Sequence, residues 1–339
     1  MGVERTLRPE RTLRPNMMKK LMSGYGVPLL VLIIIVIALS IGTKSFLSYD
    51  NIFNLARATS VYGIIAIAMT FVIVTGGIDL SVGPNVGLAG MIVALLVIQN
   101  GVNMWVAMLI AVGACALVGL ANGVMVHDGK IPAFIATMGT MTIIRAVILL
   151  ISGARNIPGF EKDFTQIAQT TIGISSADKN GVVTTYGLPL MALVWIIIIV
   201  AAFFIIRKTT FGRSVFAIGS NSEAARLSGI SVRKTTYGAY IFSAILCAIG
   251  GILLTSRLAS GIPTLGQGYE LDAIASAVIG GASLSGGEGS IGGTVVGAIL
   301  IATIRNGGVL LGLNGQIIEI LIGALIIVAV MIDRIRKGR

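Results

Sequence analysis

RKTTFGRSVFAIGSNSEAARLSGISVRKTT, residues 207–236, is a polar segment with six basic residues that separates two long apolar stretches. The run Asn221–Leu227 within it predicts a short helix, capped by Ser220 or Asn221 and ended by Gly229. A helix this short cannot cross a bilayer. The segment is therefore either a surface for a cytoplasmic partner or a solvated basic loop between two membrane spans.

The composition is that of a polytopic membrane protein. Of 339 residues, 55% are hydrophobic and 12% charged, whereas soluble domains have about 45–50% apolar and about 25% charged residues. A net charge of +11 in a soluble chain would suggest nucleic acid, but here the basic residues cluster at the ends of apolar stretches. That placement indicates membrane topology beside anionic lipid, with no nucleic-acid partner. One histidine and two separated cysteines predict neither a metal site nor a disulfide.

Ten apolar stretches predict an all-α polytopic membrane protein with about 10 transmembrane helices, several of them short or broken. They fall near 26–42, 59–76, 84–98, 104–126, 132–152, 187–206, 237–254, 271–283, 290–305 and 316–332. Residues 26–335 are expected to form one transmembrane domain. Residues 1–25, which contain ERTLRP twice, are expected to form a disordered basic tail.

Charge asymmetry predicts the orientation of the chain. With the N-terminus inside, the cytoplasmic loops and ends hold 17 of the 25 Lys and Arg residues, so both termini are expected in the cytoplasm. Residues 153–186 then form the largest external loop, either a contact for an external partner or a plain connector. Val74–Gly83 and Val278–Gly287 share six of ten residues and predict an internal repeat. This topology puts both turns on the cytoplasmic side and makes the repeat parallel, whereas an inverted repeat would contradict the topology or require one of the segments to be re-entrant.

Charges in or near the spans are expected to face the protein interior, because a charge at the centre of a lone helix costs about 2.5–3.5 kcal/mol. Asp79 follows a glycine break, where it is expected to cap the next helix or, alternatively, to contact a solute. Glu270 and Asp272 begin a short span, and carboxylates suit a helix N-terminus. Arg145 is expected to form a buried pair with a carboxylate such as Asp79 or Glu319.

Catalytic motifs are missing from the sequence. There is no phosphate-binding loop, no G-x-S-x-G, no H-E-x-x-H and no C-x-x-C. The chain is not expected to be an enzyme, and ATP would have to be bound by another polypeptide.

Four stretches carry a family resemblance: Thr70–Gly83 (TFVIVTGGIDLSVG), Pro132–Thr140 (PAFIATMGT), Thr210–Ile230 (TFGRSVFAIGSNSEAARLSGI) and Gly268–Gly287 (GYELDAIASAVIGGASLSGG). With them the chain resembles the permease subunit of bacterial ABC importers of the ribose/galactose/xylose monosaccharide class. The likeness runs from about residue 26 to about residue 335 and says little about which sugar is carried.

The resemblance implies a type II-importer-like permease in the bacterial inner membrane, working by alternating access. It implies three partners: a second copy or a paralogous permease, a cytoplasmic ATPase that holds ATP and Mg, and an extracytoplasmic sugar-binding protein. Segment 207–236 would dock on the ATPase. The coupling residues would be Gly219, Asn221, Glu223, Ala224, Ala225, Arg226 and Gly229. Candidates for the lining of the translocation path are Asp79, Asn85, Asn122, Glu270, Asp272, Ser276 and Ser283.

Three alternatives stay open. The solute is a nucleoside or an autoinducer-like sugar derivative, or the chain is an ion-coupled secondary transporter, or it is a membrane-embedded receptor or structural subunit that moves no solute. An ATPase that co-purifies with the chain would favour the importer. Uptake by the chain alone, driven by a proton or sodium gradient, would favour the secondary transporter.

Overall fold

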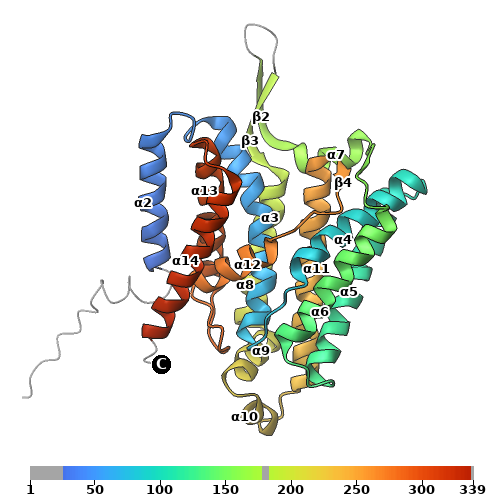
Figure 1. The fold of residues 1–339 in the computed structure, drawn as a ribbon, viewed down its shortest axis with the longest axis vertical. Coiled ribbons are helices and arrows are strands. Elements are labelled where there is room, and N and C mark those ends of the chain that lie inside the picture. The colour runs from blue at the N-terminus through green and yellow to red at the C-terminus, as the bar shows by residue number, and fades with distance from the viewer. Residues whose placement is uncertain (1–25, 178–182, 337–339) are drawn as a thin grey trace, which may run out of the picture.

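The computed structural model describes residues 26–177 and 183–336, and within them the chain is a bundle of helices (Figure 1). A helix covers each of the ten predicted spans, so the all-α membrane fold is confirmed. Their bounds are α2 (Gly26–Gly42), α3 (Tyr49–Val74), α4 (Val82–Ala94), α5 (Met104–His127), α6 (Ala133–Ser152), α8 (Leu190–Lys208), α11 (Val232–Leu258), α12 (Tyr269–Ile279), α13 (Ile291–Leu310) and α14 (Gly315–Arg336). The expected basic tail lies outside the described residues.

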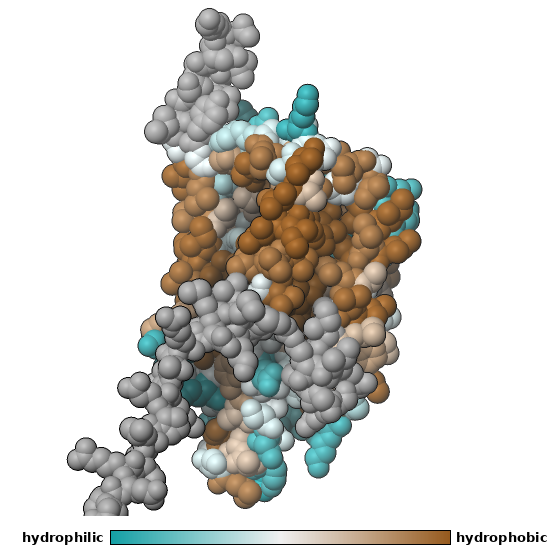
Figure 2. All heavy atoms as spheres, turned by 90° about the vertical axis from the view of Figure 1, so that its left-hand side faces the viewer, coloured by the Kyte–Doolittle hydropathy of each residue, from teal (hydrophilic) through white to brown (hydrophobic). Residues whose placement is uncertain are grey.

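Seven of the described helices are long and apolar enough to cross a membrane. They are α3, α4 with its π-helical continuation η1 (Leu95–Gln99), α5, α6, α8, α11 and α13. Large apolar side chains such as Leu109, Leu117 and Leu150 are exposed on the outer helices. On the face of the molecule over α2 and α14, Figure 2 shows a hydrophobic belt between two more hydrophilic ends. That belt is the surface a lipid bilayer would cover.

Two long helices form the centre of the bundle. The most apolar 18 residues of α3 are 83% buried and those of α11 are 72% buried, against 22% for α5 and 28% for α6. A close approach at small residues joins α5 to α11, because a side chain on Gly119 would lie 2.5 Å from the Tyr240 carbonyl oxygen. Gly123, four residues further along α5, also approaches α11 closely, so the two glycines form one small-residue contact face between these helices.

Two short helices begin inside the bundle. From α3 the chain turns at the end of the bundle that carries α10 (Ser222–Leu227), and α4 then starts in the interior (Figure 1). From α11 it turns at the opposite end, descends, and starts α12 in the interior. The first turn of α4 meets the loop that enters α12 there, since a side chain on Gly83 would lie 2.6 Å from the Gly266 carbonyl oxygen. The units α3–α4 and α11–α12 therefore have the same arrangement, a long helix followed by a turn and a short helix that starts in the interior, but they run in opposite directions.

The sequence echo relates a different pair of turns. Val74–Gly83 joins α3 to α4, and Val278–Gly287 joins α12 to α13 (Figure 1). Both turns lie at the α10 end, and the Gly287 N–H donates to the Val74 carbonyl oxygen at 2.9 Å. The two similar stretches are thus hydrogen-bonded neighbours.

The remaining elements decorate the two ends of the bundle. At one end lie α7 (Lys162–Gln169), β1 (Ile157–Pro158) paired with β4 (Ser260–Gly261), and the antiparallel hairpin β2 (Thr171–Ala177) and β3 (Val183–Pro189). At the other lie α9 (Thr210–Ser220) and α10, with the start of α2 and the end of α14 on the same side (Figure 1). We name these the hairpin end and the α10 end.

Candidate coupling and transport site

The short helix predicted in segment 207–236 is α10. The Asn221 side-chain oxygen accepts hydrogen bonds from the N–H groups of Glu223 at 3.1 Å and Ala224 at 2.9 Å, which caps the helix. Gly229 follows its end with a φ of +83°, a conformation that glycine adopts without strain. Ala225 is buried while Leu227 is 75% exposed. The result is a firmly capped helical turn at one extreme of the molecule.

Glu223 and Arg226 pair with each other on the surface of α10. Arg226 donates from Nη2 to Glu223 Oε1 at 2.5 Å and from Nε to Oε2 at 3.1 Å. The guanidinium holds the pKa of the Glu223 carboxyl below its usual range, first by hydrogen bonding and then by charge, and Glu223 raises the pKa of Arg226. An exposed pair of this kind contributes little to stability. The two hydrogen bonds nevertheless hold both side chains in a fixed orientation, so a partner that binds either charge meets a preformed pair.

The end of α9 reaches the transmembrane bundle through glycine. A side chain on Gly219 would lie 1.8 Å from the Val74 carbonyl oxygen and 2.5 Å from the Gly287 nitrogen. Three backbone segments therefore touch here: the end of α9, the end of α3, and the turn before α13. We name Gly219, Val74 and Gly287 the glycine junction. A displacement of the end of α9 would be transmitted to both echoing turns, because close-packed protein interiors have low compressibility.

A second contact ties the start of α11 to the loop after α5. Arg233 Nη2 donates to Asp128 Oδ2 at 3.0 Å, and the Tyr237 hydroxyl donates to the same oxygen. The Tyr237 hydrogen bond, more than the Arg233 charge, lowers the pKa of Asp128. No role was expected for Asp128 from the sequence. Arg233 and Tyr237, one helical turn apart, are the sequence feature that marks this contact.

Three of the predicted path residues form one buried network. Ser81 donates from its N–H at 2.9 Å and its hydroxyl at 2.6 Å to Asp79 Oδ1. The same hydroxyl accepts from Asn122 Nδ2 at 2.9 Å and Asn85 Nδ2 at 3.3 Å. Thr140 then donates to Asn122 Oδ1 at 2.6 Å. The network joins the turn before α4 to α5 and α6, and Asp79 is completely buried.

Asp79 does not cap α4, contrary to the prediction. The cap position is Ser81, which makes no side-chain cap hydrogen bond, and Asp79 instead accepts from the Ser81 N–H in the turn before the helix. Asp79, Asn85 and Asn122 share this network and are all fully buried. In this arrangement they bind one another and offer no surface to a solute.

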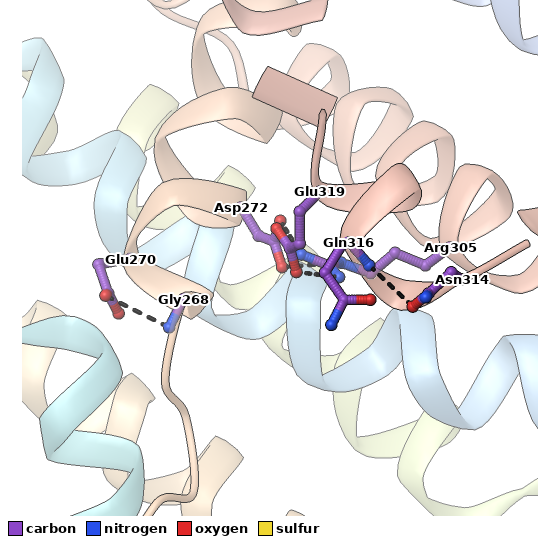
Figure 3. Close-up of polar contacts among 7 residues, drawn as sticks. All are labelled: Gly268, Glu270, Asp272, Arg305, Asn314, Gln316 and Glu319. Atoms are coloured by element: carbon purple, nitrogen blue, oxygen red, sulfur yellow. Dashed lines mark hydrogen bonds and ion pairs between the residues drawn. The ribbon is translucent and has the colours of Figure 1, made fainter. Parts of the chain in front are cut away.

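Glu270 and Asp272 occupy the first turn of α12 and point to opposite sides of it (Figure 3). The Glu270 carboxylate lies over Gly83, at the first turn of α4, and Oε1 accepts from the Gly268 N–H at 3.3 Å. Its position at two helix N-termini is favourable, because both ends carry partial positive charge.

Asp272 forms the most buried ion pair among the described residues. Arg305 donates to both of its oxygens, at 2.8 Å from Nη2 and 3.1 Å from Nε, and reaches Glu319 Oε1 at 2.9 Å from Nη1 (Figure 3). The Asp272 side chain is 2% exposed and that of Glu319 is 61% exposed. This pair fixes α12 to α13 and α14.

Arg145 does not form the pair predicted for it. Its Nη1 donates to the Leu265 carbonyl oxygen at 2.7 Å, and the carboxylate that acts on it is Glu270. Asp79 lies instead in the hydroxyl and amide network, and Glu319 binds Arg305. The prediction failed because the loop from α11 to α12 folds back into the bundle and brings an unsatisfied carbonyl to Arg145, which hydropathy cannot anticipate.

Ser276 and Ser283 lie apart from the Asp79 network. Ser276 is buried on α12 where it packs against α13, since a side chain on Gly297 would lie 2.0 Å from its carbonyl oxygen. Ser283 is in the turn after α12, where its hydroxyl accepts from the Ser285 N–H at 3.3 Å. Two hollows of about 490 and 410 Å³ lie at the hairpin end, lined by residues of 97–104 and 152–164. The predicted path residues line neither of them.

Replacing Arg145 by leucine is expected to lower the melting temperature of the detergent-purified protein. The change leaves the buried Leu265 carbonyl without its donor, a loss of about 1–3 kcal/mol. Thr142→Val on the exposed side of the same helix is the control and should melt as the wild type does. An unchanged melting temperature for the Arg145 variant would show that the 2.7 Å contact contributes no stability.

Known proteins similar to this chain are transport permeases. Residues 51–330 match the protein family described as "Branched-chain amino acid transport system / permease component". The ribose import permease protein RbsC of Bacillus subtilis (strain 168) is 40% identical over 307 residues, which cover 91% of this chain and 92% of that protein. RbsC of Escherichia coli (strain K12) is 39% identical over 309 residues, with 91% and 92% covered.

The galactose/methyl galactoside import permease protein MglC of Salmonella typhimurium is 37% identical over 331 residues, covering 93% of this chain and 95% of that protein. No solved structure matches the chain. The match to the family spans most of the bundle, from α3 to α14. The chain belongs to this family of membrane-embedded transport permease components.

Proposed function

We propose that this chain is the membrane-spanning subunit of an ATP-driven monosaccharide importer, with the ATPase on a separate polypeptide. The observation that carries the proposal is the capped helix α10, connected through the glycine junction to the ends of α3 and α12–α13. A membrane carrier that works alone needs no such element. A permease driven by a cytoplasmic motor does, because force must enter the bundle at a rigid point.

The α10 end is the cytoplasmic face under this proposal. It carries both ends of the described chain and most of the basic loops, consistent with the positive-inside rule. The hairpin end then faces outward and receives a sugar-binding protein. Two permease chains, either identical or paralogous, enclose the path. Binding of ATP and Mg by the partner moves α9 and α10, and the bundle alternates between outward and inward access.

The solute proposed is a pentose or hexose. The names of three relatives include ribose and galactose, and polar groups in the interior of this chain include the hydroxyl of Ser81 and the amides of Asn85 and Asn122. Radiolabelled uptake into proteoliposomes, with ribose, xylose and galactose compared against an amino acid and a nucleoside, tests the class. Uptake of the amino acid or nucleoside in preference to every sugar would refute the sugar assignment.

Changing Glu223 to lysine is expected to weaken binding of the ATPase while the permease still folds. The substitution replaces an internally paired carboxylate by a second cation next to Arg226, so both the pair and the charge presented to the partner change. The affinity of the ATPase for the permease should fall about 5- to 150-fold, the range that corresponds to about 1–3 kcal/mol of binding free energy. Less ATPase should therefore be recovered on the immobilised variant. Lys162→Glu at the hairpin end is the control. Equal recovery for all three proteins would remove Glu223 from the interface.

A further inference from the structure

Asp79 is a buried acid with no cation beside it. The side chain is completely buried in the turn between α3 and α4. No Lys, Arg or His of the described chain forms an ion pair with it. The titratable groups that face it are Tyr240 and Cys247, both from α11, and Cys115 of α5 lies against the neighbouring Asn85. All three are neutral groups in their ordinary state, so nothing in contact balances a negative charge.

The two carboxyl oxygens have different surroundings. Oδ1 accepts two short hydrogen bonds, from the Ser81 N–H at 2.9 Å and the Ser81 hydroxyl at 2.6 Å. Oδ2 has one long contact, 3.4 Å from the Ser243 hydroxyl oxygen. An ionised carboxylate deep inside a protein needs donors on both oxygens. One oxygen that accepts two short hydrogen bonds and one that accepts none shorter than 3.4 Å is the pattern of a protonated carboxylic acid, with Oδ1 as its carbonyl and Oδ2 as its hydroxyl.

Two polar atoms around Asp79 have no hydrogen-bond partner among the described residues. They are the Asn85 side-chain oxygen and the Tyr240 hydroxyl, on residues that are 0% and 1% exposed. Asn85 is joined to Asp79 through Ser81, and the Tyr240 hydroxyl lies beside Gly77, two residues from Asp79. The Asn85 oxygen is an acceptor without a donor, whereas the Tyr240 hydroxyl carries its own proton. A proton on Asp79 adds one donor to a cluster that holds an unpaired acceptor, and a buried polar atom without a partner costs about 1–3 kcal/mol.

We propose that Asp79 is a proton-binding site, occupied in the arrangement seen here and emptied when the surrounding helices separate. The acid joins the α3–α4 turn to α11 through Ser243 and to α5 through Ser81 and Asn122. Separation of these helices admits water, and a hydrated carboxyl group ionises at neutral pH. The closed arrangement therefore holds one more proton than the opened one, and low pH favours it. This inference concerns the permease chain by itself and does not depend on the ATPase.

Infrared spectroscopy of the purified full-length permease in detergent tests the protonation state directly. The wild type at neutral pH should show the C=O stretching band of a protonated carboxylic acid, shifted by isotopic labelling of aspartate. Asp79→Asn should lose the band, and Glu319→Gln, which alters an exposed carboxylate, should keep it. If Asp79→Asn fails to fold, Ser243→Ala replaces it, because loss of the Oδ2 contact should shift the band frequency.

The pH dependence of melting is the second measurement. A native state with one extra proton loses stability as pH rises, up to about tenfold in the folding equilibrium per pH unit. The wild type should therefore lose melting temperature between about pH 6 and about pH 8, and Asp79→Asn should lose less. Absence of the infrared band would overturn the proposal. Absence of the band together with stabilisation by sodium chloride, but not by choline chloride, would assign the site to a metal cation instead.

Discussion

Gly219→Ala is expected to abolish most sugar-dependent ATP hydrolysis while the permease still inserts and folds. The added methyl group would lie 1.8 Å from the Val74 carbonyl oxygen and 2.5 Å from the Gly287 nitrogen, distances at which backbone must move. Overpacking of this kind costs about 1–3 kcal/mol. The strain favours an arrangement in which α9 has moved away from the glycine junction. A cost of this size corresponds to about a 5- to 150-fold fall in the population of the arrangement in which α9 contacts the junction.

The control for this variant is Gly113→Ala on α5, where no atom lies within 4 Å of the added group. It makes the same chemical change in a helix and should leave hydrolysis and transport at wild-type values. Measurement of both activities in proteoliposomes separates coupling from folding. A Gly219 variant that folds as the wild type does but loses sugar-dependent hydrolysis together with sugar entry would place the fault at the junction. A variant that is fully coupled would show that force does not pass through this contact.

Arg305→Leu is expected to destabilise the folded protein strongly, because it breaks the buried ion pair with Asp272. It leaves Asp272, whose side chain is 2% exposed, as an uncompensated buried carboxylate. Breaking a buried pair from one side costs about 3–5 kcal/mol. Glu319→Gln removes only the exposed arm of the same cluster, and exposed pairs contribute about 0–1 kcal/mol. Thermal unfolding in detergent should therefore show a large fall in melting temperature for the first variant and a small one for the second.

The double variant Asp272→Asn with Arg305→Leu separates lost attraction from the cost of an unpaired charge. If the unpaired carboxylate is the main cost, the double variant should melt higher than Arg305→Leu alone. Equal melting of Arg305→Leu and Glu319→Gln would contradict the assignment of the pair as the tie between α12 and α13.

Local rules accounted for much of this architecture. Apolar length located all ten main helices, and the Asn-Ser-Glu-Ala-Ala-Arg-Leu run with its cap and its glycine located α10. These features depend on residues adjacent in the chain, so they can be predicted from the sequence. A close helix contact at Gly119 can be predicted for the same reason, because small residues spaced four apart lie on one face of a helix.

Features made by distant segments were not predictable in this way. The partner of Arg145 is a carbonyl more than a hundred residues away, exposed only because the chain folds back before α12. The reversed pairing of α3–α4 with α11–α12 has no counterpart in the sequence echo, which relates two turns at the same end. Of the seven predicted path residues, the structure brings together Asp79, Asn85 and Asn122, and places the other four on α12 and in the turn after it, apart from that network.

The central claim is that α9 and α10 couple this permease to an external ATPase. The most direct measurement is ATP hydrolysis in proteoliposomes that contain the permease, its ATPase and its binding protein, with sugar entry recorded at the same time. Hydrolysis that rises only with sugar-loaded binding protein, with sugar accumulating and with both signals lost in Gly219→Ala, is the predicted result. Sugar entry at an undiminished rate without any ATPase, driven by an ion gradient, would contradict the account.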